Sequence, residues 1–498
     1  MNPLAGASGG IPPVGRAVGG NPDRRRRASL PLAPYPPNRC SMTTPVPPVK
    51  LYEPVERPDL RWKYLRETYG DVAPAWFDPY ARGWLLLSWE SIRWAMQPAS
   101  PFSADPDHWR DMREGLIPES SGTAVQLIRR QSARFRDGGE HARYRGALQD
   151  ALQHLIDRNR VLDAVERVAY RLIAEFSRRR SDDLAAGYTY PRPVDLIGDY
   201  ARRLTGTVLA RLVGFTAAEA DRIGTLMETV WDGEPHLAMQ AWTQLAEDLA
   251  ALAEQRARHP QDDVLSFLLH DRDRPAHTRA EAADQTALLF AAGYDPTTHL
   301  IGNCLRELLT DPRMGADLRS GLGDVRAVVN TVQVHRPPVA MLPGRWVTAD
   351  HTIGHYRLRG GDLVGFGIAA ANQSLAAREL TSSTNAHLGW GTGGHGCPRA
   401  GQDIATVVAG AAVHCLFGAA PLRLAVPADA LPDRPSMVIN GLRELPVDLG
   451  EVHLPESRAA LPEPAAVRPS GPAPAAATRS PSLGERLGGF ARALLGRG

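Results

Sequence analysis

Residues 389–401, GWGTGGHGCPRAG, are the stretch of sequence that decides the fold. Glycine adopts backbone conformations with positive φ and allows close approach, so this loop can be tight. An apolar helix is expected to begin just after Cys397, and its positive end favours the thiolate form of that cysteine. The stretch is suited to presenting a thiolate to a metal. The alternative is a glycine-rich turn whose cysteine is buried only for packing.

The loop resembles the heme-binding signature of the cytochrome P450 family, FxxGx[HR]xCxG. Trp390 stands in the Phe position, Gly393 in the Gly position, His395 in the cationic position and Cys397 in the ligand position. The final glycine of the signature is Arg399 in this chain. The resemblance implies a heme b (iron protoporphyrin IX) cofactor with Cys397 as the axial ligand of its iron.

The same resemblance gives roles to the other residues of the loop. Trp390 would pack beneath the ring plane, and His395 would donate a hydrogen bond to a heme propionate. Gly391 would supply the tight backbone geometry of the loop. Pro398 has no backbone N–H to direct at the sulfur, so we expect an electron-rich thiolate and a lowered heme reduction potential. The alternative for Pro398 is a simple helix start, where proline is favoured.

Length and composition favour a large globular protein. The chain has 498 residues, of which 43% are hydrophobic and 22% charged, and its formal net charge is +2. A nucleic-acid-binding protein would more often carry a basic excess. The four cysteines show no paired spacing and fit a reducing compartment, so a cytoplasmic protein is expected. There is no run of about 18 apolar residues, so no transmembrane segment is expected.

Three regions follow from the composition. Residues 1–49 are rich in proline and arginine and predict a disordered tail. Residues 50–453 form the body. Residues 454–498 are rich in proline and alanine, and Leu483, Leu487, Phe490 and Leu494 lie at helical spacing near their end. This spacing would suit a short amphipathic helix that contacts a protein or a membrane surface. Neighbouring glycines favour a frayed tail instead.

Helical periodicity dominates the body, with short strands near both of its ends, which predicts a mainly α protein with a small β region. Residues 284–309 are expected to form the longest and most buried helix, interrupted at Gly293 and Pro296. By resemblance, the fold is that of the cytochromes P450, a triangular helical prism around heme. Further helices are expected at 90–96, 195–213, 242–253 and 402–416.

Other segments resemble the family in the expected order. EHARYR (140–145) resembles the helix start whose His and Arg hold heme propionates, which gives His141 and Arg145. Their spacing of four places them on one helix face. PGRWVTADHTI (343–353) resembles the strand whose arginine holds the other propionate, which gives Arg345.

The expected distal helix departs from the family pattern [AG]Gx[DE]T[TS]. In AAGYDPTTHLIG (291–302), Ala292, Gly293 and Asp295 match, but Pro296 stands in the position of the proton-relaying threonine. By resemblance, Asp295 and Thr297 are the candidate catalytic residues, and Ala292 and Gly293 line the oxygen pocket. Either Thr297 or a hydroxyl of the substrate replaces the missing group, or oxygen activation is impaired. Asp295 as a helix cap is the structural alternative.

The buried Glu–Arg pair typical of the family is absent as well. In VVNTVQVHRPPV (328–339), Thr331 and Val334 stand in its two positions. Loss of both partners leaves no uncompensated buried charge, so it is compatible with folding. His335 or Arg336 is a candidate for supporting the heme side instead.

By resemblance, the function is that of a soluble bacterial heme-thiolate monooxygenase. It would oxidise an apolar small molecule with O2 and electrons from a ferredoxin and a ferredoxin reductase. Pro296, Thr331 and Val334 leave two alternatives open. One is a peroxide-driven or non-oxidative heme enzyme, and the other is a heme-binding regulatory or scaffold protein.

Overall fold

The computed structural model describes residues 46–455 except 54, 56–57, 157–159, 271–275, 321–322 and 377–385. The predicted N-terminal tail up to residue 45, the C-terminal tail from residue 456 with its amphipathic pattern, and Cys40 lie outside the described residues. The unit described below is the one that contains residues Met1–Pro455. It is mainly helical with a small β region, so the predicted fold class is confirmed.

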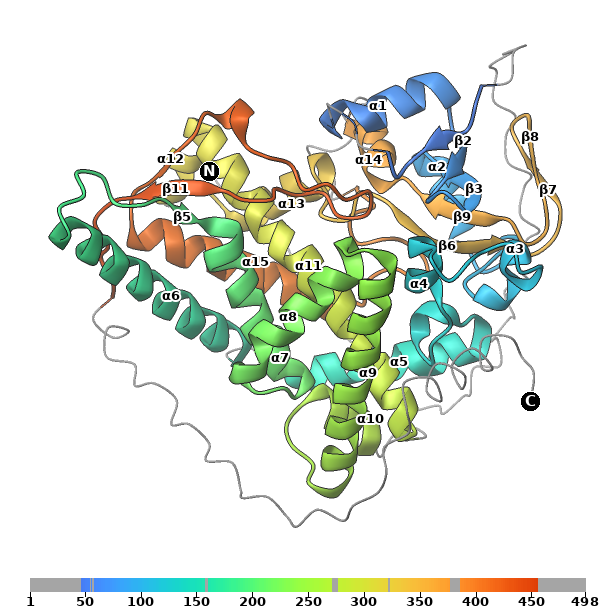
Figure 1. Ribbon diagram of the computed structural model, residues 1–498, viewed down its shortest axis with the longest axis horizontal. Coiled ribbons are helices and arrows are strands. Elements are labelled where there is room, and N and C mark those ends of the chain that lie inside the picture. Colours follow the sequence, from blue (N-terminus) through green and yellow to red (C-terminus); the bar gives the residue numbers. More distant parts are fainter. Residues whose placement is uncertain are drawn as a thin grey trace, which may run out of the picture. The chain divides into compact units, whose positions relative to one another are not determined.

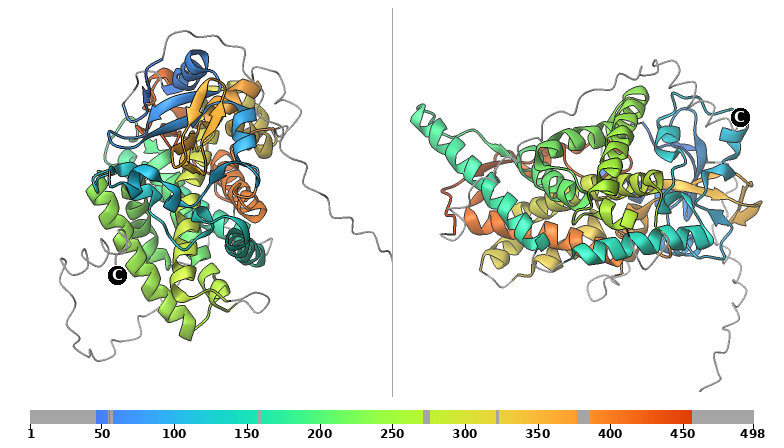
Figure 2. Two further views of the ribbon diagram at one scale, coloured as in Figure 1. Left: turned by 90° about the vertical axis from the view of Figure 1, so that its right-hand side faces the viewer. Right: turned by 90° about the horizontal axis from the view of Figure 1, so that it is seen from below.

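A six-stranded mixed sheet combines strands from residues 49–103 with two strands from residues 342–366 (Figures 1 and 2). Its order is β1-β2-β3-β9-β6-β4; β1 pairs parallel with β2, β3 pairs parallel with β9, and the other pairs are antiparallel. The strands are β1 (Val49–Lys50), β2 (Val72–Trp76), β3 (Arg82–Leu86), β4 (Phe102–Ser103), β6 (Leu342–Val347) and β9 (Leu363–Phe366). The β6–β9 register shifts between Pro343 and Arg345, at Gly344, whose φ is +110°.

Two smaller sheets complete the β region. β10 (Leu422–Leu424), β11 (Pro446–Leu449) and β5 (Val194–Asp195) form an antiparallel sheet in that order, and β7 (His351–Ile353) pairs with β8 (Tyr356–Leu358). β10 and β11 flank the segment 425–445, so their pairing brings the two ends of that segment together.

The helices carry most of the apolar core. They are α1 (Pro58–Tyr69), α2 (Trp89–Ala95), α3 (Arg110–Arg113), α4 (Gly122–Leu127), α5 (Gly138–Leu155), α6 (Arg160–Ala185), α7 (Arg203–Val213), α8 (Ala217–Asp232), α9 (Pro235–Arg258), α10 (Val264–His270), α11 (Arg279–Thr310), α12 (Pro312–Arg319), α13 (Val325–His335), α14 (Ile368–Ala376) and α15 (Arg399–Ala419). Short turns precede or follow them: η1 (Pro106–His108), η2 (Ala133–Phe135), the π-helical η3 (Leu196–Arg202) and η4 (Ala428–Ala430).

Helix α11 is central, as its apolar sequence predicts, and it packs against α7, α9, α13 and α15 (Figure 1). A capping box closes its N-terminus. The Thr278 side chain accepts a hydrogen bond from the Glu281 N–H, and the Glu281 side chain accepts one from the Thr278 N–H. The predicted interruption at Gly293 and Pro296 is wrong, because α11 runs unbroken from Arg279 to Thr310. Packing on several sides stabilises the helix against the loss of one backbone hydrogen bond.

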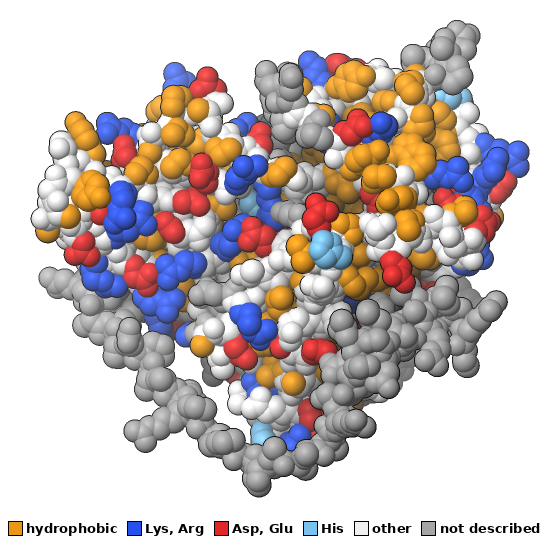
Figure 3. All heavy atoms as spheres, viewed as in Figure 1, with side chains coloured by type: hydrophobic (Ala, Val, Ile, Leu, Met, Phe, Trp, Pro, Cys, Tyr) orange, Lys and Arg blue, Asp and Glu red, His pale blue; other side chains and the backbone are white. Residues whose placement is uncertain are grey.

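Helix α15 is buried along one side against α6 and α11. By length and composition it is the one helix in the described ranges apolar enough to cross a membrane, and half of the qualifying window is buried inside the fold. On the face seen in Figure 3, basic and acidic side chains alternate, in keeping with the small net charge of the chain.

Candidate functional site

The cysteine loop is closed by its own backbone. The N–H of Cys397 donates to the carbonyl oxygen of Trp390 at 2.7 Å, and the N–H of Gly391 donates to Leu388 at 2.7 Å. Gly391 and Gly393 have φ values of +72° and +67°, which side-chain-bearing residues rarely adopt. A Cβ at Gly393 would lie 2.3 Å from the carbonyl oxygen of Met96. The glycines therefore allow both the conformation of the turn and its close packing against the segment after α2.

The sulfur of Cys397 lies beside the first turn of α15. A Cβ at Gly401 would stand 3.2 Å from Sγ, and the Gln402 side chain donates to the carbonyl oxygen of Cys397 at 2.9 Å. Pro398 precedes this turn and contributes no N–H. Burial raises the pKa of the Cys397 thiol to about 12, although the nearby Arg145 opposes the rise. A bound metal cation is what makes such a thiol ionise at neutral pH.

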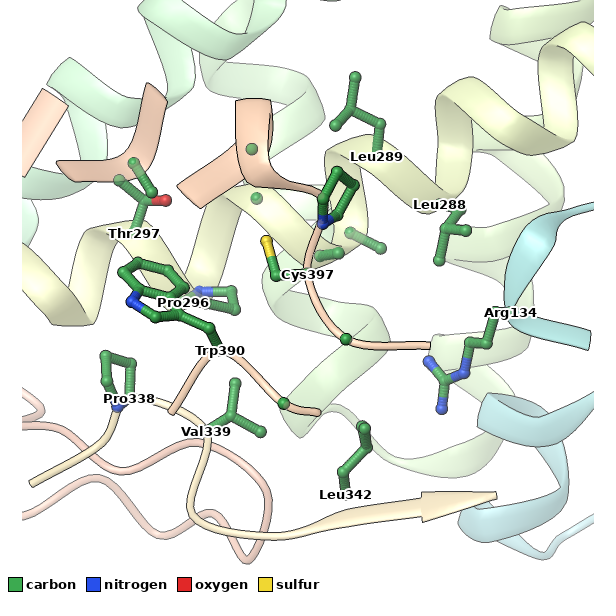
Figure 4. A pocket seen from close by; sticks show the side chains of 18 of the residues that line it. Arg134, Leu288, Leu289, Pro296, Thr297, Pro338, Val339, Leu342, Trp390 and Cys397 are labelled. Carbon is green, nitrogen blue, oxygen red and sulfur yellow. The ribbon is translucent and has the colours of Figure 1, made fainter. Parts of the chain in front are cut away.

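Cys397 opens onto a cavity of about 310 Å³ lined mainly by apolar side chains (Figure 4). The walls come from α5, α7, α11, α15 and β6 and from the segments around Pro338 and Ile439. Among the apolar lining residues are Leu209, Leu289, Leu342, Val408 and Val438. Trp390 also lines the cavity, from the same loop as Cys397.

Helix α11 contributes Ala292, Gly293, Pro296 and Thr297 to the cavity wall. Because Pro296 has no N–H, the carbonyl of Ala292 lacks its helical donor. Asp295 is not among the lining residues. It is fully buried on another side of α11, where Arg434 donates to it at 3.0 Å. The structure thus brings Thr297 to the cavity and holds Asp295 away from it.

One end of the cavity is cationic. His141, Arg145, Arg345 and His395 all line it, and the rings of the two histidines are 3.9 Å apart between centroids. Arg145 donates to the carbonyl oxygens of Gly394 and Gly396 at 3.3 and 3.0 Å. Burial, with the neighbouring His395 and Arg145, lowers the pKa of His141 to about 4.

A carboxylate orients this cationic end from behind. His395 Nε2 contacts Asp137 at 3.3 Å, and Asp137 also accepts from the Ser103 hydroxyl and from the Ala104 N–H. Although burial opposes it, these hydrogen bonds hold the pKa of Asp137 below its usual range. Asp137 therefore stays ionised and fixes the His395 ring.

Arg134 is a fifth basic residue at this end, and no sequence motif pointed to it. It lies on η2, whose Ala133 N–H donates to Gln285 of α11 at 2.9 Å, while Gln285 donates to the carbonyl of Tyr144 at 2.8 Å. Burial lowers the pKa of Arg134 to about 10, yet it remains a cation at neutral pH. In RRQSARFR (129–136) four arginines look alike, so only the fold distinguishes this one.

At the cationic end of the cavity, three buried nitrogen atoms have no hydrogen-bond partner among the described residues: His141 Nε2, Arg145 Nη1 and Arg134 Nη2. Unpartnered buried donors are costly, so they indicate an anionic ligand that this end is built to bind. Cationic side chains at one end and a thiol on the same wall fit a heme with two propionates.

The segment before the cysteine loop is tied to α13 by an amide. Asn372 of α14 donates to the carbonyl of Gln333 and accepts from the Leu388 N–H, both at 2.8 Å. The Gln333 side chain lines the cavity, whereas Val334 is buried nearby.

The two candidates for supporting the heme side lie elsewhere. Arg336 pairs with Glu307 of α11 at 2.8 Å and does not line the cavity, and His335 is exposed. Neither therefore supports the heme side, and Asn372 is the residue that anchors the approach to the cysteine loop.

No protein-family model matches the chain. The vitamin D(3) 25-hydroxylase of Pseudonocardia autotrophica is 28% identical over 377 residues, which cover 74% of this chain and 88% of that protein. Cytochrome P450 107B1 of Saccharopolyspora erythraea is 31% identical over 281 residues, covering 54% of this chain and 68% of that protein. The solved structure of CYP154C4 from Streptomyces sp. W2061 is 26% identical, covers 82% of this chain and 99% of its own, and superimposes with a TM-score of 0.71.

Proposed function

The chain belongs to the cytochrome P450 family and is an oxidoreductase of that family; from this premise, we propose that it oxidises an apolar small molecule with O2 as a heme-thiolate monooxygenase. The observation that carries the proposal is the position of Cys397. Its thiol opens onto an apolar cavity, beside the first turn of α15 and near unpartnered donors at the cationic end.

The residues of the site fit heme b. Cys397 would hold the iron, and Trp390 and Gly391 would shape the loop beneath the ring. His141, Arg145, Arg345 and His395 would hold the propionates, and the unpartnered donors of His141 and Arg145 support this assignment. Bound in this way, heme supplies the activation of O2 for oxygen insertion.

Thr297 is the candidate for moving protons on the distal side. Its side chain lines the cavity from α11, one residue after Pro296, which can neither donate nor accept through a side chain. We propose that the Thr297 hydroxyl, with a hydroxyl of the substrate where one is present, transfers protons into the cavity. Ala292 and Gly293 leave room beside it because their side chains are small.

The cavity walls are apolar, and this supports a small apolar substrate that binds by burial of its surface. The proposed electron donors are a ferredoxin and its reductase, and the proposed location is the cytoplasm. Family membership and the bacterial origin of the relatives support both proposals.

A two-stage experiment tests the proposal. The reduced protein with carbon monoxide should give the Soret band of thiolate ligation, and Cys397→Ser should abolish that band. The wild-type protein with a ferredoxin, its reductase and NADPH should then consume O2 and convert an apolar substrate found by spin-shift screening. A band typical of histidine ligation would exclude Cys397 as the ligand, and failure to form product would exclude the ferredoxin-driven reaction.

The peroxide-driven reaction is the second candidate, and Pro296 on the cavity wall favours it. A reaction started by hydrogen peroxide does not require the proton relay that delivers protons to bound O2. Product formed with peroxide but not with the ferredoxin system would support this alternative.

A further inference from the structure

Helix α11 carries a buried polar face that does not line the cavity. Asp295, His299 and Asn303 follow one another at helical-turn spacing, and each is at most 1% exposed. None of the three lines the cavity. Buried polar side chains need partners, and the segment 433–441 contacts each of the three, although Asp295 Oδ1 and His299 Nδ1 have no partner among the described residues.

Arg434 connects two of these residues. Its Nη2 donates to Asp295 Oδ2 at 3.0 Å, and its Nη1 contacts His299 Nε2 at 2.5 Å. The Arg434 side chain is only 5% exposed, so this is a buried charged network. Since a guanidinium only donates, His299 accepts at Nε2 and is neutral. Burial and the Arg434 charge lower the pKa of His299 well below its usual range, which agrees with that state.

The backbone of the same segment lies directly on α11. A Cβ at Gly441 would stand 2.1 Å from Nδ1 of His299, so this position has no room for a side chain. Asn303 donates to the carbonyl of Asn440 at 2.9 Å. The Arg434 N–H donates to the carbonyl of Gly441 at 2.9 Å, which closes the segment on itself.

The tip of the segment reaches the cavity. Val438 and Ile439 both line it, and they are held on their other side by the strand-like segment 338–340. The Ala340 N–H donates to Val438, and the Asn440 N–H donates to Pro338, both at 2.8 Å. The tip is thus fixed between this segment and the polar face of α11.

We propose that Asp295, Arg434 and His299 form a clamp that positions Val438 and Ile439 and thereby determines which ligands the cavity accepts. Asp295 acts in this clamp through Arg434, as a positioning residue. The proposal deepens the proposed function, because it rests on the same cavity being the substrate site. It does not depend on whether the protein activates O2.

Four variants distinguish an effect of losing the clamp from an effect of losing stability. Arg434→Met alone leaves Asp295 as an uncompensated buried charge, which is strongly destabilising. Asp295→Leu combined with Arg434→Met removes both charges, and buried pairs replaced in this way are often tolerated. Arg434→Lys keeps a charge near Asp295 but loses the planar fork that reaches two partners. Arg443→Met is the matched control, because Arg443 is an exposed arginine close to the same segment.

Two ferric heme ligands probe the cavity by their optical spectra, imidazole as the small one and 4-phenylimidazole as the bulky one. In the double variant, the ratio of their dissociation constants should change on the order of tenfold relative to the wild type. The ratio should change less in Arg434→Lys and stay at the wild-type value in Arg443→Met. An unchanged ratio in the double variant would overturn the proposal, because loss of stability alone does not favour one ligand.

Amide hydrogen exchange gives a second readout that needs neither turnover nor a ligand. In the double variant, the amides of Arg434, Ile439 and Asn440 should exchange on the order of tenfold faster than in the wild type, with Arg443→Met unchanged. Wild-type protection in the double variant would also overturn the clamp. If the protein shows no oxygenase activity but the ligand ratio and the amide exchange both change as expected, the clamp is supported and the proposed function is not.

Discussion

The backbone N–H of Cys397 donates to the carbonyl oxygen of Trp390 at 2.7 Å, and this bond closes the loop that presents the sulfur. The closure depends on Gly391, which follows Trp390 with φ of +72° and whose Cβ, if present, would lie 3.1 Å from Gly396 Cα. The orientation of Cys397, the proposed heme ligand, therefore depends on the backbone conformation of Gly391.

Gly391→Ala should displace the loop, because alanine is disfavoured at this φ by about 1 to 2 kcal/mol. We expect a smaller fraction of the reduced protein to show the thiolate-type band with carbon monoxide. Gly418→Ala is the control, since a Cβ at that helical position meets no atom within 4 Å. Equal spectra for the two variants would contradict a special role of Gly391.

Pro398→Ala should raise the heme reduction potential, by an amount on the order of tens of millivolts. The substitution restores an N–H beside the sulfur, and a donated hydrogen bond withdraws electron density from the thiolate. Spectroelectrochemical titration of both proteins measures the shift. Absence of a positive shift would leave Pro398 as a helix start only.

Thr297→Val should lower the fraction of consumed NADPH that appears as product, by at least about tenfold if the hydroxyl relays protons. The lost reducing equivalents should appear as hydrogen peroxide. Thr298→Val is the matched control, because the neighbouring Thr298 is buried but does not line the cavity. A similar loss in both variants would indicate a structural effect of the helix.

Arg134→Gln should weaken heme retention, because it removes a buried guanidinium whose Nη2 has no partner within the described part of the chain. Transfer of heme to an excess of apomyoglobin should become faster, on the order of tenfold. Arg129→Gln tests the specificity of the effect, since Arg129 pairs with Asp105 and Asp107 and does not line the cavity. Equal transfer rates would show that Arg134 does not contribute to heme retention.

Glu281→Gln should destabilise the protein at pH 7 but not in acid. Although burial opposes it, hydrogen bonds from Arg143, Thr278 and Tyr144 lower the pKa of Glu281 from 4.5 to about 2. A carboxyl whose pKa is lower in the folded state stabilises above its unfolded pKa, and that stability is lost as the pH falls toward 2. After allowance for solvent screening, the effect at pH 7 is on the order of 1 to 2 kcal/mol.

Urea unfolding at pH 7 and pH 3 measures this difference for Glu281→Gln. Glu140→Gln is a suitable comparison because Glu140 is exposed. A free-energy difference between Glu281→Gln and the wild type that is the same at both pH values would exclude the ionised carboxylate as its source.

The residues to which the sequence patterns give a role in heme binding, in the cysteine loop and among the basic side chains, all line one cavity, because their patterns are local. His141 and Arg145 are one turn apart on α5, and Cys397 precedes an apolar helix. These relationships depend on local sequence and not on how distant segments pack. Arg345 follows from its place in a recognisable strand. The fold that this chain shares with its relatives then brings each of these residues to the cavity wall.

Other features could not be predicted because they depend on distant segments. Pro296 predicts a break in α11, but packing against α7, α9 and α13 keeps the helix continuous. Asp295 fits a family motif, yet its partner Arg434 is far away in sequence, and no pattern in the sequence links the two residues. Arg134 cannot be distinguished from its neighbouring arginines by sequence, because its position depends on the hydrogen bond between η2 and Gln285.

The close approach of Gly441 to the His299 ring has a practical consequence for laboratory evolution. Libraries that randomise the whole segment 434–441 to obtain new products will consist largely of misfolded clones, because Gly441 and Arg434 tolerate little change. Mutagenesis confined to Val438 and Ile439 keeps the scaffold intact and samples the cavity directly. Within this segment, the changes that alter selectivity without loss of folding should therefore be concentrated at these two codons.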